Sequence, residues 1–190
     1  AIGFTTARFL VIESDKRSLV AVKELQERRE PILDIKFSPS GNLLAVASNE
    51  NKIDIYDCTS NYARVSTCEG HTNFVTKLDW SADDAYIRST CCEYDLMFWE
   101  TTKGTCMKNP KELRDVQWAT ETCLLGWGVR GIWSKDSDGA DINAVARGPN
   151  HESCVTGSDN GAISLYRYPV VDEEQDHRSY SAHSSSVSNV

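Results

Sequence analysis

The sequence contains no apolar run that approaches the length needed to cross a bilayer. A membrane-spanning helix needs about 20 consecutive apolar residues, and here polar or charged residues interrupt every apolar stretch. The first eight residues also lack the basic and then apolar order of a secretory signal peptide. These absences argue against a helical membrane protein, and we expect no membrane partner.

An excess of positive charge is also missing. The chain of 190 residues has 20 Lys and Arg against 28 Asp and Glu, which gives a formal net charge of −8. Proteins that bind nucleic acid present a basic face whose contacts with phosphate release counterions. The acidic balance therefore disfavours a nucleic-acid partner.

The seven cysteines lack the spacing of a metal site or a disulfide framework. Their number is odd and their spacing irregular, so we expect reduced thiols in a cytosolic protein. The only close pair is Cys91-Cys92, and adjacent residues cannot easily wrap one zinc ion. We expect no structural metal.

Motifs of catalysis are absent as well. No Gly-x-Ser-x-Gly elbow or His-Glu-x-x-His helix occurs, and the glycines near residue 130 lack the strand-to-helix context of a phosphate-binding loop. We expect neither a catalytic residue nor a bound cofactor, and the chain is predicted to be no enzyme.

What the sequence does contain is alternation of apolar and polar residues with period two, the pattern of half-buried strands. Residues 32–37 alternate, a Pro and Gly turn follows, and two further strand patterns occupy 43–47 and 52–56. These three strands leave no room for a crossover helix, so they form an antiparallel meander. The pattern recurs over 74–99 and 142–166.

The copies are nearly regular in spacing. Their first strands start at Ile32, Val75, Ile142 and Val187, which gives offsets of 43, 67 and 45 residues. Two of these offsets match the roughly 40 to 45 residues of a four-stranded propeller blade. The longer middle offset predicts an insertion between two blades.

The second copy carries a recognisable set of residues. Gly70-His71 precedes its first strand and Trp99 closes its third, an arrangement that resembles a WD40 repeat. His71, Ser89, an acid in the next turn (Glu93) and the Trp99 indole can satisfy one another in a buried hydrogen-bond chain. The repeat position explains His71 better than a role in acid-base catalysis.

The insertion makes the resemblance more specific. Residues 113–133 and 137–145, together with Leu78-Asp79-Trp80-Ser81 and Leu165-Tyr166-Arg167-Tyr168-Pro169, resemble the C-terminal WD40 propeller of the echinoderm microtubule-associated protein-like (EML) family. The similarity covers roughly residues 8–190. It implies a cytoskeletal protein that associates with microtubules or tubulin, built from two joined propellers.

We therefore predict an all-β fold, a WD40-type β-propeller segment of about four blades that is incomplete at the C-terminus. The expected blades span approximately residues 8–66, 67–112 and 113–169, with the insertion at 113–139. A further blade is expected to start at 178–190.

Candidate contact residues fall in two groups. One is basic: such clusters are usually solvated, but acidic tubulin would require a local positive patch on a chain of net negative charge. The other lies in the segment Gly126–Trp133, which forms either an extra strand and loop packed on the blades or an exposed aromatic surface. The candidates are Lys103, Lys108, Lys111, Arg114, Trp127, Arg130 and Trp133.

An acidic run, Asp172-Glu173-Glu174-Gln175-Asp176, follows the third copy. It is most simply a solvated connection between strands, and the alternative is a docking site for a basic partner.

The function expected is a non-enzymatic scaffold whose blades present loops to tubulin or to microtubule-associated partners, in the cytoplasm on the microtubule cytoskeleton. The alternative is a general WD40 adaptor that recruits a peptide or an enzyme without a filament role.

Overall fold

The computed structural model describes residues 1–14, 18–133, 142–181 and 183–190. These residues form antiparallel sheets and two short 3₁₀ helices, so the predicted all-β, WD40-type fold is confirmed. The chain divides into two compact units, Ala1–Ala119 and Thr120–Val190. Among the described residues, no helix is long and apolar enough to cross a membrane.

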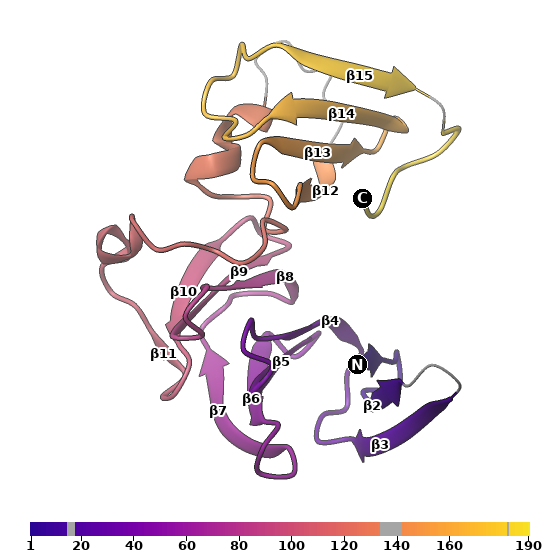
Figure 1. The fold of residues 1–190 in the computed structure, drawn as a ribbon, viewed down its shortest axis with the longest axis vertical. Coiled ribbons are helices and arrows are strands. Elements are labelled where there is room, and N and C mark those ends of the chain that lie inside the picture. Colours follow the sequence, from indigo (N-terminus) through magenta and orange to yellow (C-terminus); the bar gives the residue numbers. More distant parts are fainter. Residues whose placement is uncertain (15–17, 134–141, 182) are drawn as a thin grey trace. The chain divides into compact units, whose positions relative to one another are not determined.

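The first unit contains three sheets, each a meander of strands consecutive in sequence (Figure 1). The first sheet has three strands and the other two have four. Their strands are β1 (Ile2–Gly3), β2 (Phe9–Ser14) and β3 (Leu19–Leu25); β4 (Ile32–Phe37), β5 (Leu43–Ser48), β6 (Lys52–Asp57) and β7 (Ala63–Glu69); and β8 (Val75–Trp80), β9 (Tyr86–Cys91), β10 (Leu96–Glu100) and β11 (Thr105–Cys106). The 3₁₀ helix η1 (Pro110–Leu113) follows β11.

The second unit contains one four-stranded meander and the second 3₁₀ helix, η2 (Trp127–Ile132). Its strands are β12 (Ile142–Arg147), β13 (Ser153–Ser158), β14 (Ala162–Arg167) and β15 (His177–Ser181). The apolar side chains of η2, Val129 and Ile132, pack in one cluster with Val145, Cys154 and Tyr166 of this sheet.

All three four-stranded sheets share one register. In each, the first and second strands are offset by a β-bulge just after the first paired residue, at Ile32, Val75 and Ile142. A bulge inserts one residue and increases the local twist. Its recurrence at the same place shows that the three copies are one repeated structural unit.

Burial follows the position of a strand in its sheet. In β5, β6 and β9 almost every side chain is buried or half-buried, which explains why β5 (Leu-Leu-Ala-Val-Ala-Ser) is a nearly continuous apolar run. The last strands, β7 and β15, are mostly exposed and carry charged or polar residues, as suits a sheet edge.

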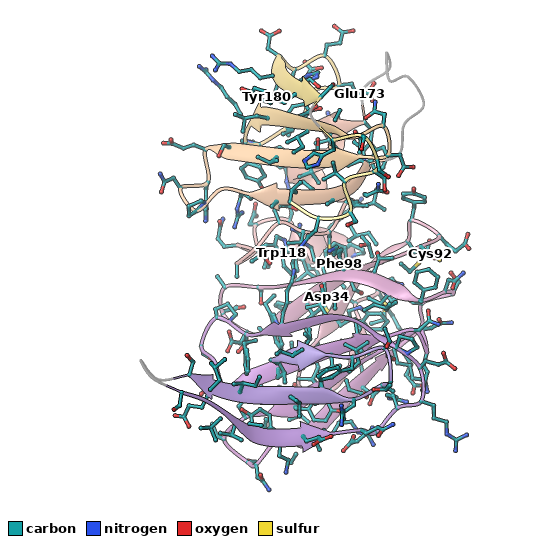
Figure 2. All side chains as sticks on the ribbon, turned by 90° about the vertical axis from the view of Figure 1, so that its right-hand side faces the viewer. Asp34, Cys92, Phe98, Trp118, Glu173 and Tyr180 are labelled. Atoms are coloured by element: carbon teal, nitrogen blue, oxygen red, sulfur yellow. The ribbon has the colours of Figure 1, made fainter. Side chains whose placement is uncertain are left out.

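The first part of the insertion pairs with the third sheet, formed by β8–β11. The Ala119 backbone N–H donates to the Trp80 carbonyl at 2.8 Å, and the Ala82 N–H donates to Gln117 at 2.7 Å. Between them Trp118 lies against Phe98, with ring centroids 5.8 Å apart (Figure 2). Residues 134–141 of the insertion lie outside the described residues.

The expected blade bounds differ from the observed sheets at both ends. The range 8–66 covers strands of two sheets, because β2 pairs with β1 and β3 and not with β4. The boundary at residue 178 falls inside β15, because this strand pairs with β14 as the last strand of its sheet. Residues 183–190 form no strand, although the Val187 N–H donates to the Ser158 carbonyl at 3.0 Å.

Candidate functional site

Three of the four predicted network residues meet in the third sheet, formed by β8–β11. His71 Nε2 lies 2.6 Å from Ser89 Oγ, and the Trp99 indole N–H donates to the same hydroxyl at 2.8 Å. All three side chains are buried. Ser89 Oγ thus accepts from the Trp99 indole and shares a second hydrogen bond with His71 Nε2, whose direction depends on the imidazole tautomer.

Glu93 lies in the exposed turn between β9 and β10 and accepts a hydrogen bond from Asn73 at 3.1 Å. Among the described residues, the buried Nδ1 of His71 has no hydrogen-bond partner. Burial lowers the pKa of His71 below its usual value, an effect that the Asp95 carboxylate partly opposes. The geometry is that of a neutral structural histidine.

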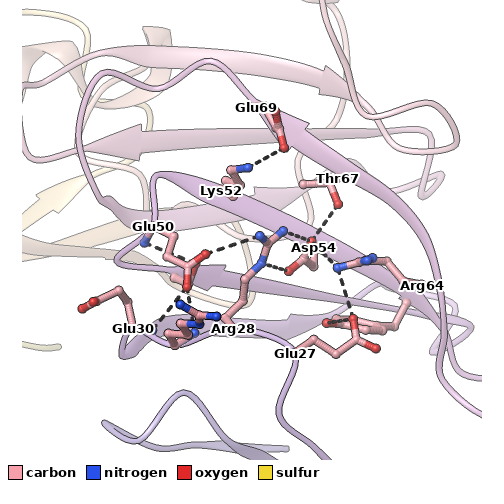
Figure 3. A network of polar contacts seen from close by, with 12 residues as sticks. Glu27, Arg28, Glu30, Glu50, Lys52, Asp54, Arg64, Thr67 and Glu69 are labelled. Atoms are coloured by element: carbon pink, nitrogen blue, oxygen red, sulfur yellow. Dashed lines mark hydrogen bonds and ion pairs between the residues drawn. The ribbon is translucent and has the colours of Figure 1, made fainter.

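The preceding sheet fills the equivalent position with an ion pair. Arg28 stands four residues before β4, as His71 stands four residues before β8. Its guanidinium donates two hydrogen bonds to Asp54, from Nε to Oδ2 at 2.7 Å and from Nη2 to Oδ1 at 2.6 Å (Figure 3). The shared register places Val46 where Ser89 stands, so this sheet has no hydroxyl at the position that links the histidine and the tryptophan of the next sheet.

The Asp54 carboxylate is almost completely buried, and its side chain is 3% exposed. Thr67 donates a third hydrogen bond to it at 2.7 Å. Arg28 also lies 3.4 Å from Glu50, and its pKa is raised, chiefly by the hydrogen bonds to Asp54. These hydrogen bonds hold strands β6 and β7 to the segment before β4.

A second buried ion cluster joins two sheets at β4, β8 and β9. Arg88 donates to Asp79 Oδ2 from Nε at 3.2 Å and from Nη2 at 3.1 Å, and Lys36 Nζ lies 3.4 Å from Asp79 Oδ1. The Arg88 guanidinium also covers the Trp118 ring at 4.7 Å from its centroid. The charges of this cluster are engaged with one another, which fits a structural role.

The buried cysteines are unsuited to act as nucleophiles. Burial raises the pKa of the Cys68 and Cys154 thiols to about 12, so both remain protonated at neutral pH and are poor nucleophiles. All seven cysteines are free thiols. Within the described ranges, no three His, Cys, Asp or Glu side chains gather as a metal site would require.

The basic candidates of the first unit lie on and around η1. Lys108, Lys111 and Arg114 are exposed. Residues three apart eclipse one another in a 3₁₀ helix, so Lys111 and Arg114 project from one face. Lys103 is different, because its ammonium is held 2.9 Å from Glu100.

The candidates of the second unit divide between surface and core. Trp127 is 70% exposed, and Arg130, three residues on, is exposed with its Nε donating to the Val171 carbonyl at 2.7 Å. Trp133 is half-buried, packs against the core of the unit and donates from Nε1 to the Leu124 carbonyl at 3.3 Å. Of the two alternatives for this segment, the extra strand is wrong, because residues 127–132 form a 3₁₀ helix.

Repeated antiparallel sheets with a common bulge and a buried His-Ser-Trp network define a WD40-type β-propeller protein. The family model described as "Echinoderm microtubule-associated protein second beta-propeller" matches residues 1–190. The chain belongs to this family, as the sequence predicted.

Named relatives agree over the full chain. It is 42% identical to the 77 kDa echinoderm microtubule-associated protein of Strongylocentrotus purpuratus, covering 28% of that protein. It is 38% identical to echinoderm microtubule-associated protein-like 1 of Mus musculus and 37% identical to echinoderm microtubule-associated protein-like 4 of Xenopus tropicalis, covering 24% and 21% of them. The chain thus spans less than a third of the length of these relatives.

Proposed function

We propose that this chain is a non-enzymatic interaction platform of a microtubule-associated protein and that it contacts tubulin directly. The observation that carries the proposal is the family match over the whole chain, together with relatives that are themselves named microtubule-associated proteins. The fold suits the role because paired strands hold connecting loops in fixed positions while leaving the loop sequences free to vary. Its place in the cell would then be the microtubule cytoskeleton.

The contact surface we propose is basic. Tubulin is acidic, and a chain of net charge −8 meets long-range repulsion unless a local positive patch faces the filament. Lys108, Lys111 and Arg114 supply such a patch on and beside η1, and we name it the η1 patch. The neighbouring Glu112 accepts a hydrogen bond from the Asn109 side chain at 3.0 Å, which holds that carboxylate on its own turn.

Co-sedimentation with polymerised tubulin tests this assignment. The triple variant Lys108→Glu, Lys111→Glu, Arg114→Glu is expected to lose most of its pelleting and to weaken in pull-downs with soluble tubulin. Since the three side chains are exposed, its thermal unfolding should match that of the unchanged chain.

A matched control changes the charge equally at exposed arginines elsewhere: Arg29→Glu, Arg167→Glu, Arg178→Glu. This control should pellet like the unchanged chain. If both triple variants lost pelleting equally, net charge alone would explain the effect. The η1 patch would then be excluded as the contact surface. Binding of the unchanged chain to neither form of tubulin would favour the alternative, a WD40 adaptor for a peptide or an enzyme.

A further inference from the structure

Trp127 differs from every other tryptophan of the chain. Trp80 and Trp99 are buried, Trp118 and Trp133 are half-buried, and Trp127 is 70% exposed. Tryptophan is enriched among the residues that dominate binding energy at interfaces. Trp127, whose indole is exposed to solvent on an ordered 3₁₀ helix, is therefore a candidate contact residue.

The backbone beneath this indole is fixed. The Gly128 carbonyl accepts from the Val170 N–H at 2.8 Å, and the Gly131 N–H donates to the Val170 carbonyl at 2.8 Å. A Cβ on Gly131 would overlap the backbone of Asp172, so the two segments lie in direct contact. Because η2 is held at Gly128 and Gly131, directly after Trp127 and Arg130, a partner would not need to order this turn on binding.

The charges beside the indole define the chemistry of a partner. Arg130 lies three residues after Trp127, on the same face of η2. It shares a hollow of about 570 Å³ with Val171, Asp172, Glu173 and Glu174. Three acidic residues and one arginine line this hollow, which gives the surface a negative balance, opposite to that of the η1 patch.

We propose that Trp127 and the adjoining hollow, which we name the η2 surface, bind a basic segment of a partner protein. A Lys or Arg side chain would lie over the indole face, where a cation is attracted by the ring quadrupole. A second basic residue would face the carboxylates of residues 172–174, with charge complementarity setting the preference. This partner is distinct from tubulin, and the inference does not depend on the proposed microtubule contact.

The test uses the 190-residue chain and three short synthetic peptides of equal length, one rich in Lys and Arg, one with Gln and one with Glu at the same positions. Tryptophan fluorescence and calorimetry should show saturable binding of the basic peptide only. Subtracting the spectrum of Trp127→Phe isolates the signal of this indole. Trp127→Ala is expected to weaken binding by about tenfold, with Trp127→Phe between it and the unchanged chain.

Matched variants locate the site. Glu173→Gln with Glu174→Gln should weaken the basic peptide, whereas Tyr180→Ala, which removes another half-exposed aromatic ring of the same unit, should not. Equal affinity for the Gln peptide, no saturable binding, or full affinity in Trp127→Ala would each overturn the proposal. Loss of microtubule pelleting in Trp127→Ala without any peptide binding would also overturn it, by assigning the indole to tubulin.

Discussion

Replacement of Asp54 by Asn should destabilise the first unit through the charge left on Arg28. The substitution keeps the shape of the side chain but removes the carboxylate that receives both hydrogen bonds of the guanidinium. Removing one partner of a buried ion pair typically costs about 3 to 5 kcal/mol. Here the Arg28 side chain is 17% exposed and keeps Glu50 at 3.4 Å, so we expect a loss at or just below the lower limit of that range, about 2 to 3 kcal/mol.

For a unit of this size, a loss of that magnitude corresponds to a fall in Tm of roughly 5 to 12 °C. Circular dichroism during heating measures it, and urea unfolding checks that the slope with denaturant is unchanged, so that the shift reports stability alone.

A second variant separates the ion pair from simple damage to packing. Arg28→Met with Asp54→Leu removes both charges together, and apolar replacements of a buried pair are often neutral or stabilising, so the double variant should recover most of the lost stability. Lys103→Ala, which breaks the exposed pair with Glu100, should leave the Tm unchanged. A Tm of Asp54→Asn equal to that of the unchanged chain, or a double variant as unstable as the single one, would refute the reasoning.

Three further outcomes are expected. Because burial lowers the pKa of His71, the unfolded chain takes up a proton first as the pH falls, so stability should decline below about pH 6.5; melts at pH 7.5, 6.5 and 5.5 should show a smaller decline in His71→Gln, and an equal decline would contradict this. Trp99→Phe removes the donor to Ser89 and leaves a cavity beside it, so urea unfolding should show a loss of about 1 to 3 kcal/mol; a neutral result would deny the network a stabilising role. Gly131→Ala forces a Cβ against the backbone of Asp172 and should lower the stability of the second unit by about 1 to 3 kcal/mol; a melt like that of the unchanged chain would show that the turn can shift.

The repeated strands could be predicted because their signal is local. Alternation within six residues and Gly or Asn in the turns are read directly from adjacent positions, and the sheets formed by β4–β7 and β8–β11 follow that pattern. The contact among His71, Ser89 and Trp99 could also be predicted from the sequence, because each residue stands at a fixed offset within its repeat. The partner of Glu93 could not be predicted, because a side chain in an exposed turn has several possible partners. In the structure Glu93 accepts from Asn73.

The Arg28 network could not be predicted from the sequence for a different reason. Arg28-Arg29 reads as a solvated basic pair, and a carboxylate partner 26 residues away leaves no local trace. The offset of four residues before the first strand, shared with His71, was the one available signal. A second basic pair of the sequence, Lys16-Arg17, lies outside the described residues.

The insertion shows the same limit. Its glycines and tryptophans indicated close backbone packing, but the partner segment at residues 168–172 follows about 40 residues later in the chain. Whether residues 127–132 become a strand or a 3₁₀ helix depends on that long-range contact. Propensity within the segment could therefore not decide which tryptophan would be buried and which exposed.

The buried polar networks and the proposed contact surfaces lie on different parts of the chain. Stability and binding can therefore be altered separately. Arg28 and His71 occupy the same position, four residues before the first strand of a sheet, but their networks have unrelated chemistry. That position therefore accepts either an ion pair or a neutral hydrogen-bond chain. The η1 patch and the η2 surface lie instead in segments outside the β-strands. Substitutions in the networks should therefore change the melting temperature while leaving the intrinsic affinity of the folded chain unchanged. Substitutions at Lys111 or Trp127 should do the reverse, and a variant of either kind that moved both quantities would show that blade and surface are coupled.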